Sequence, residues 1–126
     1  MLLFVCLRGS KSGRGTCELC VALLALDLRP DRPDEAEQLA AELYAQIKGG
    51  AEFDALVKEH TDDAHPGIYG MTMKGEGDQK KGVYKRSGMV GAFGDVGWRL
   101  DVNQVGVAPY HPRNSPYGWH IIKRLK

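Results

Sequence analysis

The chain has almost no net charge and no long hydrophobic run. Its 17 lysines and arginines against 16 aspartates and glutamates leave a formal charge of +1 over 126 residues. No overall field therefore favours nucleic acid or an anionic membrane, and no apolar stretch reaches the roughly 20 residues that a membrane-spanning helix needs. We expect no nucleic acid partner and no membrane span, and the length fits one domain with its own core.

Cysteine is scarce, with Cys6, Cys17 and Cys20 only. An odd count argues against a secreted disulfide framework. Cys17 and Cys20 have the spacing of a redox or zinc pair, but a structural zinc site needs four ligands and no second pair follows. We expect no metal and no cofactor. A metal or redox protein built on Cys17 and Cys20 stays as an alternative hypothesis.

The N-terminal residues lack the features of a secretory signal. Residues 2–7 are apolar, but no basic stretch precedes them and Arg8 follows at once. This favours a cytoplasmic location, and the alternative is that the chain is a fragment of an exported protein. Residues 2–7 and residues 18–28 are the two candidates for a first strand, and a basic Gly/Ser linker at residues 9–16 separates them.

Two helices are predicted in the first half of the chain. Asp31 can cap the first, Pro33 fits its first turn, and apolar residues then recur at helical spacing through residues 36–47. Two glycines at residues 49–50 end it. A second, shorter helix is predicted over residues 53–60.

The second half of the chain is predicted to hold a strand, a helix and two closing strands. The strand covers residues 68–73 and the helix residues 89–100, where three glycines make tertiary packing necessary. Residues 102–108 lead into a strand, and the last strand follows Gly118. Residues 74–87 are polar and carry five lysines and arginines, which indicates a solvated loop or, alternatively, a basic rim that steers acidic or phosphorylated peptides.

The closing segment carries the most information. A Pro-Tyr-Gly turn at residues 116–118 runs into Trp119-His120-Ile121-Ile122, a run of aromatic and β-branched residues that favours a strand. Alternation along a strand places His120 and Ile122 on one side. A histidine in such a place is most often a satisfied core residue.

This segment resembles the C-terminal signature of the parvulin (rotamase) family of peptidyl-prolyl cis-trans isomerases, an aromatic-Gly-aromatic-His-Ile-Ile strand. Four more segments resemble the family's motifs in the same order, which makes the resemblance far more specific than one motif. They are Gly49–Leu56 for the Gly-x-x-Phe-x-x-Leu helix start, Thr61-Asp62-Asp63 for the Ser-Asp-Cys/Asp step, Gly67-Ile68-Tyr69-Gly70 for Gly-Asp-Leu-Gly, and Met89–Leu100 for the Met-x-x-x-Phe-x-x-x-x-Phe-x-Leu helix.

The resemblance implies an α+β fold, a four-stranded antiparallel sheet wrapped by three to four helices. Residues 33–126 would form the parvulin-like domain and residues 1–32 the first strand plus an atypical linker or insert, a single domain overall. It implies isomerisation of X-Pro bonds without a cofactor. The partners would be proline-containing peptides or unfolded proteins, and we expect a monomer.

The resemblance also implies the site. Asp63 and His120 would be the catalytic residues, with Asp63 at the carbonyl edge and His120 a hydrogen-bonding organiser rather than a base. Met89 and Phe93 would form one wall of a proline pocket and Trp98 its floor. The remaining pocket residues would be Tyr69 and Tyr117, whereas Asp62 would serve the turn after its helix.

Two family features are absent. The family usually has a histidine in its first strand, and neither apolar run contains one. Two residues before Gly118, where a serine or threonine is common, this chain has Pro116. The alternative to an enzyme is therefore a catalytically weak parvulin-like peptide-binding or chaperone module that uses the same groove.

Overall fold

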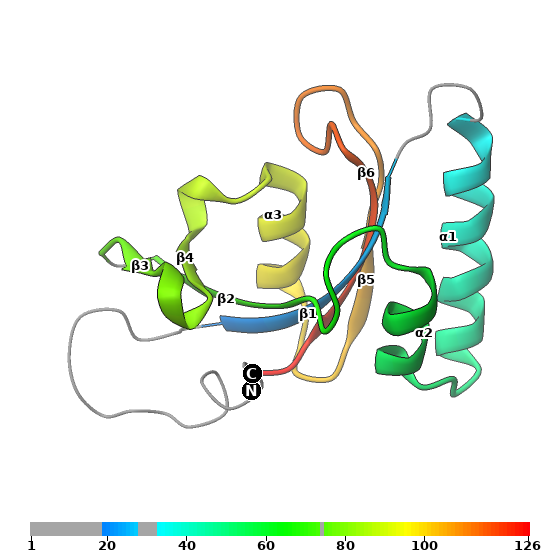
Figure 1. Ribbon diagram of the computed structural model, residues 1–126, viewed down its shortest axis with the longest axis horizontal. Coiled ribbons are helices and arrows are strands. Elements are labelled where there is room, and N and C mark those ends of the chain that lie inside the picture. The colour runs from blue at the N-terminus through cyan, green and yellow to red at the C-terminus, as the bar shows by residue number, and fades with distance from the viewer. Residues whose placement is uncertain (1–18, 28–32, 74) are drawn as a thin grey trace.

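The computed structural model describes residues 19–27, 33–73 and 75–126, shown in colour in Figure 1. The expectations for residues 2–7, residues 9–16, Cys17 and Asp31 lie outside the described residues. Six strands form one sheet in the order β3-β4-β2-β1-β6-β5. In chain order they are β1 (Leu19–Asp27), β2 (Ile68–Thr72), β3 (Gly77–Asp78), β4 (Val83–Lys85), β5 (Val105–Ala108) and β6 (Gly118–Arg124).

The strand β1 is the centre of the sheet and comes from the second of the two apolar runs. It pairs antiparallel with β2 on one side and with β6 on the other. Leu19 to Leu26 are all buried, because both faces of β1 are covered. A strand covered on both faces needs an uninterrupted apolar run, which residues 19–26 supply.

Helices cover the two faces of the sheet unequally (Figure 1). The helices α1 (Pro33–Lys48) and α2 (Phe53–His60) lie on one face, where Leu43 and Phe53 pack with Leu24. The helix α3 (Gly91–Arg99) lies on the other, where Phe93 packs with Val21. No helix within the described ranges is long and apolar enough to span a membrane.

The fold class is α+β as expected, but the sheet has six strands instead of four and is mixed. The four neighbouring strands β2-β1-β6-β5 are the antiparallel set that the sequence indicates. Residues 74–87 are expected to form a loop, but from residue 75 onwards this segment holds β3 and β4 with two 3-10 turns, η1 (Gln79–Lys81) and η2 (Arg86–Gly88). β4 runs parallel to β2. Val83 is buried there, so one apolar side chain in a polar segment anchors the addition.

The glycines of α3 allow the helix to sit close to the sheet. A Cβ added at Gly97 would lie 3.4 Å from the side chains of both Met71 and Val21. This close approach supplies the tertiary packing that a glycine-rich helix requires. The sequence predicts a helix that includes Met89, but α3 begins at Gly91, so Met89 lies in the segment before it.

Candidate active site

A groove of about 300 Å³ opens on the α3 face of the sheet. Its lining comes from the strands β1, β2 and β6, from α3 and the segment leading into it, from the turn after α2, and from the loop between β5 and β6. The lining residues are Leu23, Ala25, Asp62, Asp63, Tyr69, Met89, Val90, Phe93, Tyr117 and His120. The structure thus brings together all the site residues expected from the sequence except Trp98.

The inner wall of the groove is aromatic. Phe93 is only 2% exposed, and its ring lies edge-on to Tyr69 with 5.9 Å between the centroids. The ring of His120 lies 6.2 Å from that of Phe93. Met89 adds a thioether side chain from the segment before α3. Such a wall is suited to a compact apolar ring, because aromatic and thioether groups supply large contact areas.

Trp98 is not part of the groove. It packs against the core cluster that contains Phe93. Its ring faces Arg86, whose guanidinium carbon lies 5.6 Å from the ring centroid. The reason is the helical repeat: five residues after Phe93, a side chain points roughly 140° away around the helix axis. A sequence motif cannot by itself distinguish the groove side of α3 from this one.

Asp63 lies at the edge of the groove in a fixed arrangement. The phenol of Tyr69 donates a hydrogen bond to its Oδ2, and the backbone N–H of Ala64 donates to Oδ1 over 2.8 Å. The hydroxyl oxygen of Thr61 accepts a hydrogen bond from the backbone N–H of Ala25 over 3.1 Å, which ties this turn to β1. Both carboxylate oxygens of Asp63 therefore have donors of their own.

The phenol of Tyr69 stays a hydrogen-bond donor to Asp63, because its pKa is raised. Burial raises the pKa of its phenol, and the hydrogen bond to Asp63 and the charge of that carboxylate raise it further. The phenol stays protonated at neutral pH. The backbone N–H of Asp62 donates a hydrogen bond to the carbonyl of Ala25 over 2.8 Å, which fits the turn role expected of this residue. Asp62 also lines the groove, which was not expected.

His120 is buried at 7% exposure on β6 and lines the groove, as the alternation along the strand predicts. Its Nδ1 lies 3.1 Å from Oγ of Ser115, and Ser115 donates its own proton to the carbonyl of Gly118 over 2.9 Å. A hydroxyl has one proton to give, so Nδ1 of His120 carries the proton shared with Ser115. Burial lowers the pKa of His120, against an opposing effect of the Asp63 charge, and the ring is neutral.

Ser115 is the residue that the sequence reasoning missed. It is fully buried, and it stands three residues before Gly118, one position earlier than Pro116. The sequence signal that could have indicated Ser115 is a hydroxyl residue just before the turn that leads to His120. The β-bridge between His111 and Ser115 holds that turn in shape.

The floor of the groove on β1 is aliphatic. Leu23 and Ala25 line it, and Ala25 stands beside His120 in the sheet register. No histidine occurs in β1, so this strand offers the groove no imidazole. His120 is therefore the one imidazole among the lining residues that the structure describes.

Cys20, the described member of the cysteine pair, does not line the groove. Cys20 is buried on the opposite face of the sheet, where it lines a separate cavity of about 450 Å³ with Phe53 and Val57. Within residues 19–27, 33–73 and 75–126 no three histidine, cysteine, aspartate or glutamate side chains are grouped for a metal ion.

Comparison with known proteins gives a family. The rotamase model, the PPIC-type PPIase domain, matches residues 23–126, which includes β1 from Leu23 onwards. The chain therefore belongs to the parvulin-type rotamase family. It is also similar to the solved structure of Pin from the psychrophilic archaeon Cenarcheaum symbiosum, with 25% sequence identity, a TM-score of 0.49, and coverage of 94% of this chain and 100% of that chain.

Proposed function

We propose that this chain catalyses the cis-trans isomerisation of X-Pro bonds in peptides or unfolded proteins. The observation that carries the proposal is a groove that combines an aromatic wall with a hydrogen-bonded carboxylate at its edge. Phe93, Met89 and Tyr69 would hold the proline ring. Asp63 would face the carbonyl group of the residue that precedes the substrate proline.

The chemistry needs only non-covalent stabilisation. Conjugation of the amide nitrogen with its carbonyl creates a barrier of about 18–20 kcal/mol. A catalyst must favour the twisted amide, in which conjugation is lost. The conjugated form places negative charge on the carbonyl oxygen, so an apolar wall and the nearby Asp63 carboxylate both disfavour it relative to the twisted form.

Within this proposal His120 is a positioning residue. Its ring lines the inner part of the groove beside Phe93, and its hydrogen bond with Ser115 fixes its orientation. No proton has to leave the substrate, so a neutral imidazole is sufficient. Exposed Tyr117 would contact the peptide next to the proline.

A second function, a peptide-binding or chaperone module without significant turnover, is favoured by one observation. Leu23 and Ala25 supply the β1 side of the groove, where the family usually has a first-strand histidine. The loss of one polar group from the site could leave binding intact and reduce catalysis.

Exchange between the cis and trans forms of a short Ala-Pro peptide, measured by NMR with the whole chain added, tests the proposal. Uncatalysed exchange takes about 10–100 s, and we expect catalytic amounts of protein to accelerate it. Met89→Ala should reduce the acceleration, whereas Met73→Ala, which alters an exposed methionine outside the groove, should not. Peptide binding without faster exchange would favour the module over the enzyme.

A further inference from the structure

We propose that the groove prefers X-Pro bonds in which X is lysine or arginine, and that Asp63, held by Tyr69, sets this preference. This inference rests on the proposed function and names its substrate class. It is argued from the charge of the groove lining and from the position of Tyr117 at the groove edge.

The lining of the groove has negative charge and no positive charge of its own. Asp62 and Asp63 contribute two carboxylates, and the ten described lining residues include no lysine or arginine. His120 is neutral, because burial opposes its protonation. A cationic side chain of a bound peptide would therefore meet only attractive charge here.

Asp63 is held before any ligand arrives. Tyr69 and the N–H of Ala64 each donate to one of its oxygens. The ring of Tyr69 is in turn fixed between Tyr84 and Phe93, with 5.9 Å between centroids in each pair. Binding a cation to a fixed carboxylate costs less conformational entropy than binding it to a free one.

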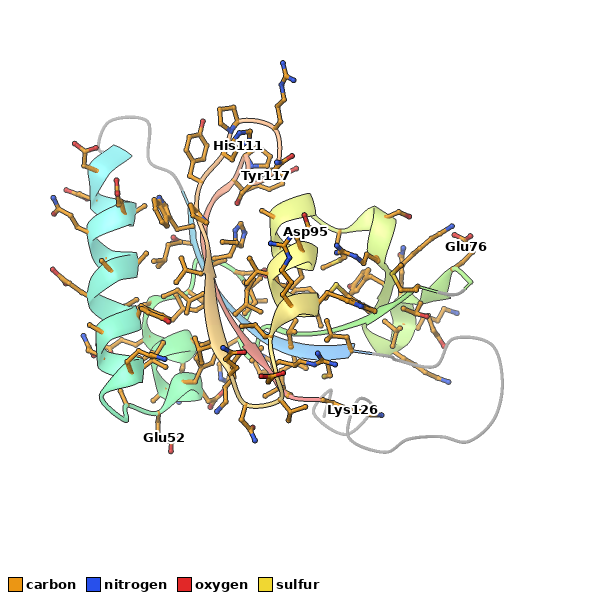
Figure 2. The ribbon with its side chains drawn as sticks, turned by 180° about the vertical axis from the view of Figure 1, so that it is seen from behind. Glu52, Glu76, Asp95, His111, Tyr117 and Lys126 are labelled. Carbon is orange, nitrogen blue, oxygen red and sulfur yellow. The ribbon has the colours of Figure 1, made fainter. Side chains whose placement is uncertain are left out.

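Tyr117 gives the same edge a surface for a long basic side chain. It is 66% exposed although it lines the groove, and Figure 2 shows it on the loop that joins β5 to β6. An exposed aromatic face attracts a cation and can cover the methylene stem of lysine or arginine. Tyr117 would therefore contact the methylene stem of a lysine or arginine, and Asp63 would pair with its positive charge.

Three of the four described basic residues of the segment before α3 have acidic partners in the protein, which argues against the alternative basic rim. Lys85 lies 2.8 Å from Glu76 and Lys81 lies 3.5 Å from Asp78. Arg86 pairs with Asp95. Figure 2 shows Glu76 at the far end of this segment, well away from Tyr117. These cations have acidic partners inside the protein, so they offer little to an acidic peptide.

The test compares three peptides that differ only in the residue before proline: lysine, glutamine or glutamate. We expect kcat/KM to be about threefold higher for lysine than for glutamine and lowest for glutamate, the size expected for exposed charge pairs. Because such pairs are screened over about 8–10 Å at physiological ionic strength, added salt should bring the three values together.

Variants connect the preference to its residues. Asp63→Asn should lower turnover of all three peptides and also bring the lysine-to-glutamate ratio close to one. Tyr69→Phe keeps the ring but releases the carboxylate, so the ratio should fall part of the way. Glu42→Gln removes the same charge from an exposed position on α1, on the other side of the sheet, and should leave the ratio unchanged.

The outcomes separate this inference from the proposed function. Equal turnover of all three peptides would overturn the preference and leave the isomerase intact. A preference for glutamate would overturn it in favour of the basic rim. If no peptide is isomerised, the proposed function fails, and the affinities of the same peptides then decide the preference: tighter binding of the lysine peptide supports it and equal affinities refute it.

Discussion

His120 and Ser115 lie on either side of the turn that precedes β6, with 3.1 Å between Nδ1 and Oγ. Both side chains are buried, so neither can exchange its partner for water. The pair fixes which ring nitrogen of His120 carries the proton and how the ring is oriented in the groove.

Ser115→Ala should therefore destabilise the fold and reduce turnover together. It leaves a buried Nδ1–H without an acceptor, which costs about 1–3 kcal/mol in the free energy of unfolding. Urea unfolding measures this cost, and NMR of the ring nitrogens should show a changed tautomer balance in His120. Ser87→Ala, at an exposed position, should change the free energy of unfolding by less than about 0.5 kcal/mol. An unchanged tautomer in Ser115→Ala would contradict the assignment.

Phe93→Leu should reduce kcat/KM for an Ala-Pro peptide by about tenfold, which corresponds to about 1.4 kcal/mol of lost transition-state binding. Leucine keeps most of the buried volume, so the stability loss should be smaller than the about 3–5 kcal/mol of a change to alanine. Phe53→Leu is the matched control, because Phe53 is equally buried but packs on the opposite face. Equal losses of activity in both variants would show that Phe93 acts only through the core.

Asp63→Asn should lower turnover more than Asp62→Asn. Both side chains line the groove, but Asp63 receives the hydrogen bond of Tyr69, which holds it at the proposed carbonyl position. Both substitutions remove one charge from neighbouring positions, so they serve as controls for each other. The ordering of their kcat/KM values on a neutral peptide is the measurement, and a larger loss at position 62 would refute the assignment.

The stability of the protein should decrease as the pH falls below about 6.5, the ordinary value for histidine. Burial lowers the pKa of His120 in the folded state, so the unfolded chain takes up a proton that the folded one resists. Unfolded molecules then bind more protons, and the free energy of unfolding drops with decreasing pH. Urea unfolding at several pH values should show a weaker drop in His120→Gln, which retains the other three histidines. Parallel curves would count against a buried neutral His120.

Local patterns in the sequence account for most of the fold. The periodic apolar residues of α1, its closing glycines and the alternation along β6 each depend on residues close in the chain. The strands β3 and β4 could not be predicted in this way, because they are very short and β4 depends on contact with β2. The start of α3 at Gly91 likewise involves a distant part of the chain, because the backbone N–H of Ala92 donates to the carbonyl of Asn114 over 2.9 Å.

Family motifs predict the positions of the proposed site residues in the chain, but they do not predict how each side chain is oriented. Asp63, Phe93 and His120 follow from motifs, and the structure brings them into one groove. Trp98 fits its motif equally well but turns toward Arg86. The bond between Tyr69 and Asp63 joins residues from separate motifs and becomes visible only in three dimensions.

The width of the groove depends in part on Gly97, a residue of α3 that does not line the groove. Gly97 sets how closely α3 approaches Val21 and Met71, and Phe93 is carried by the same rigid helix one turn away. A Cβ at position 97 would already touch the side chains of Met71 and Val21, so a side chain larger than alanine there would lift the helix and move Phe93 away from His120. Size selection by the groove could thus be changed, in evolution or by design, through a residue that never contacts a peptide.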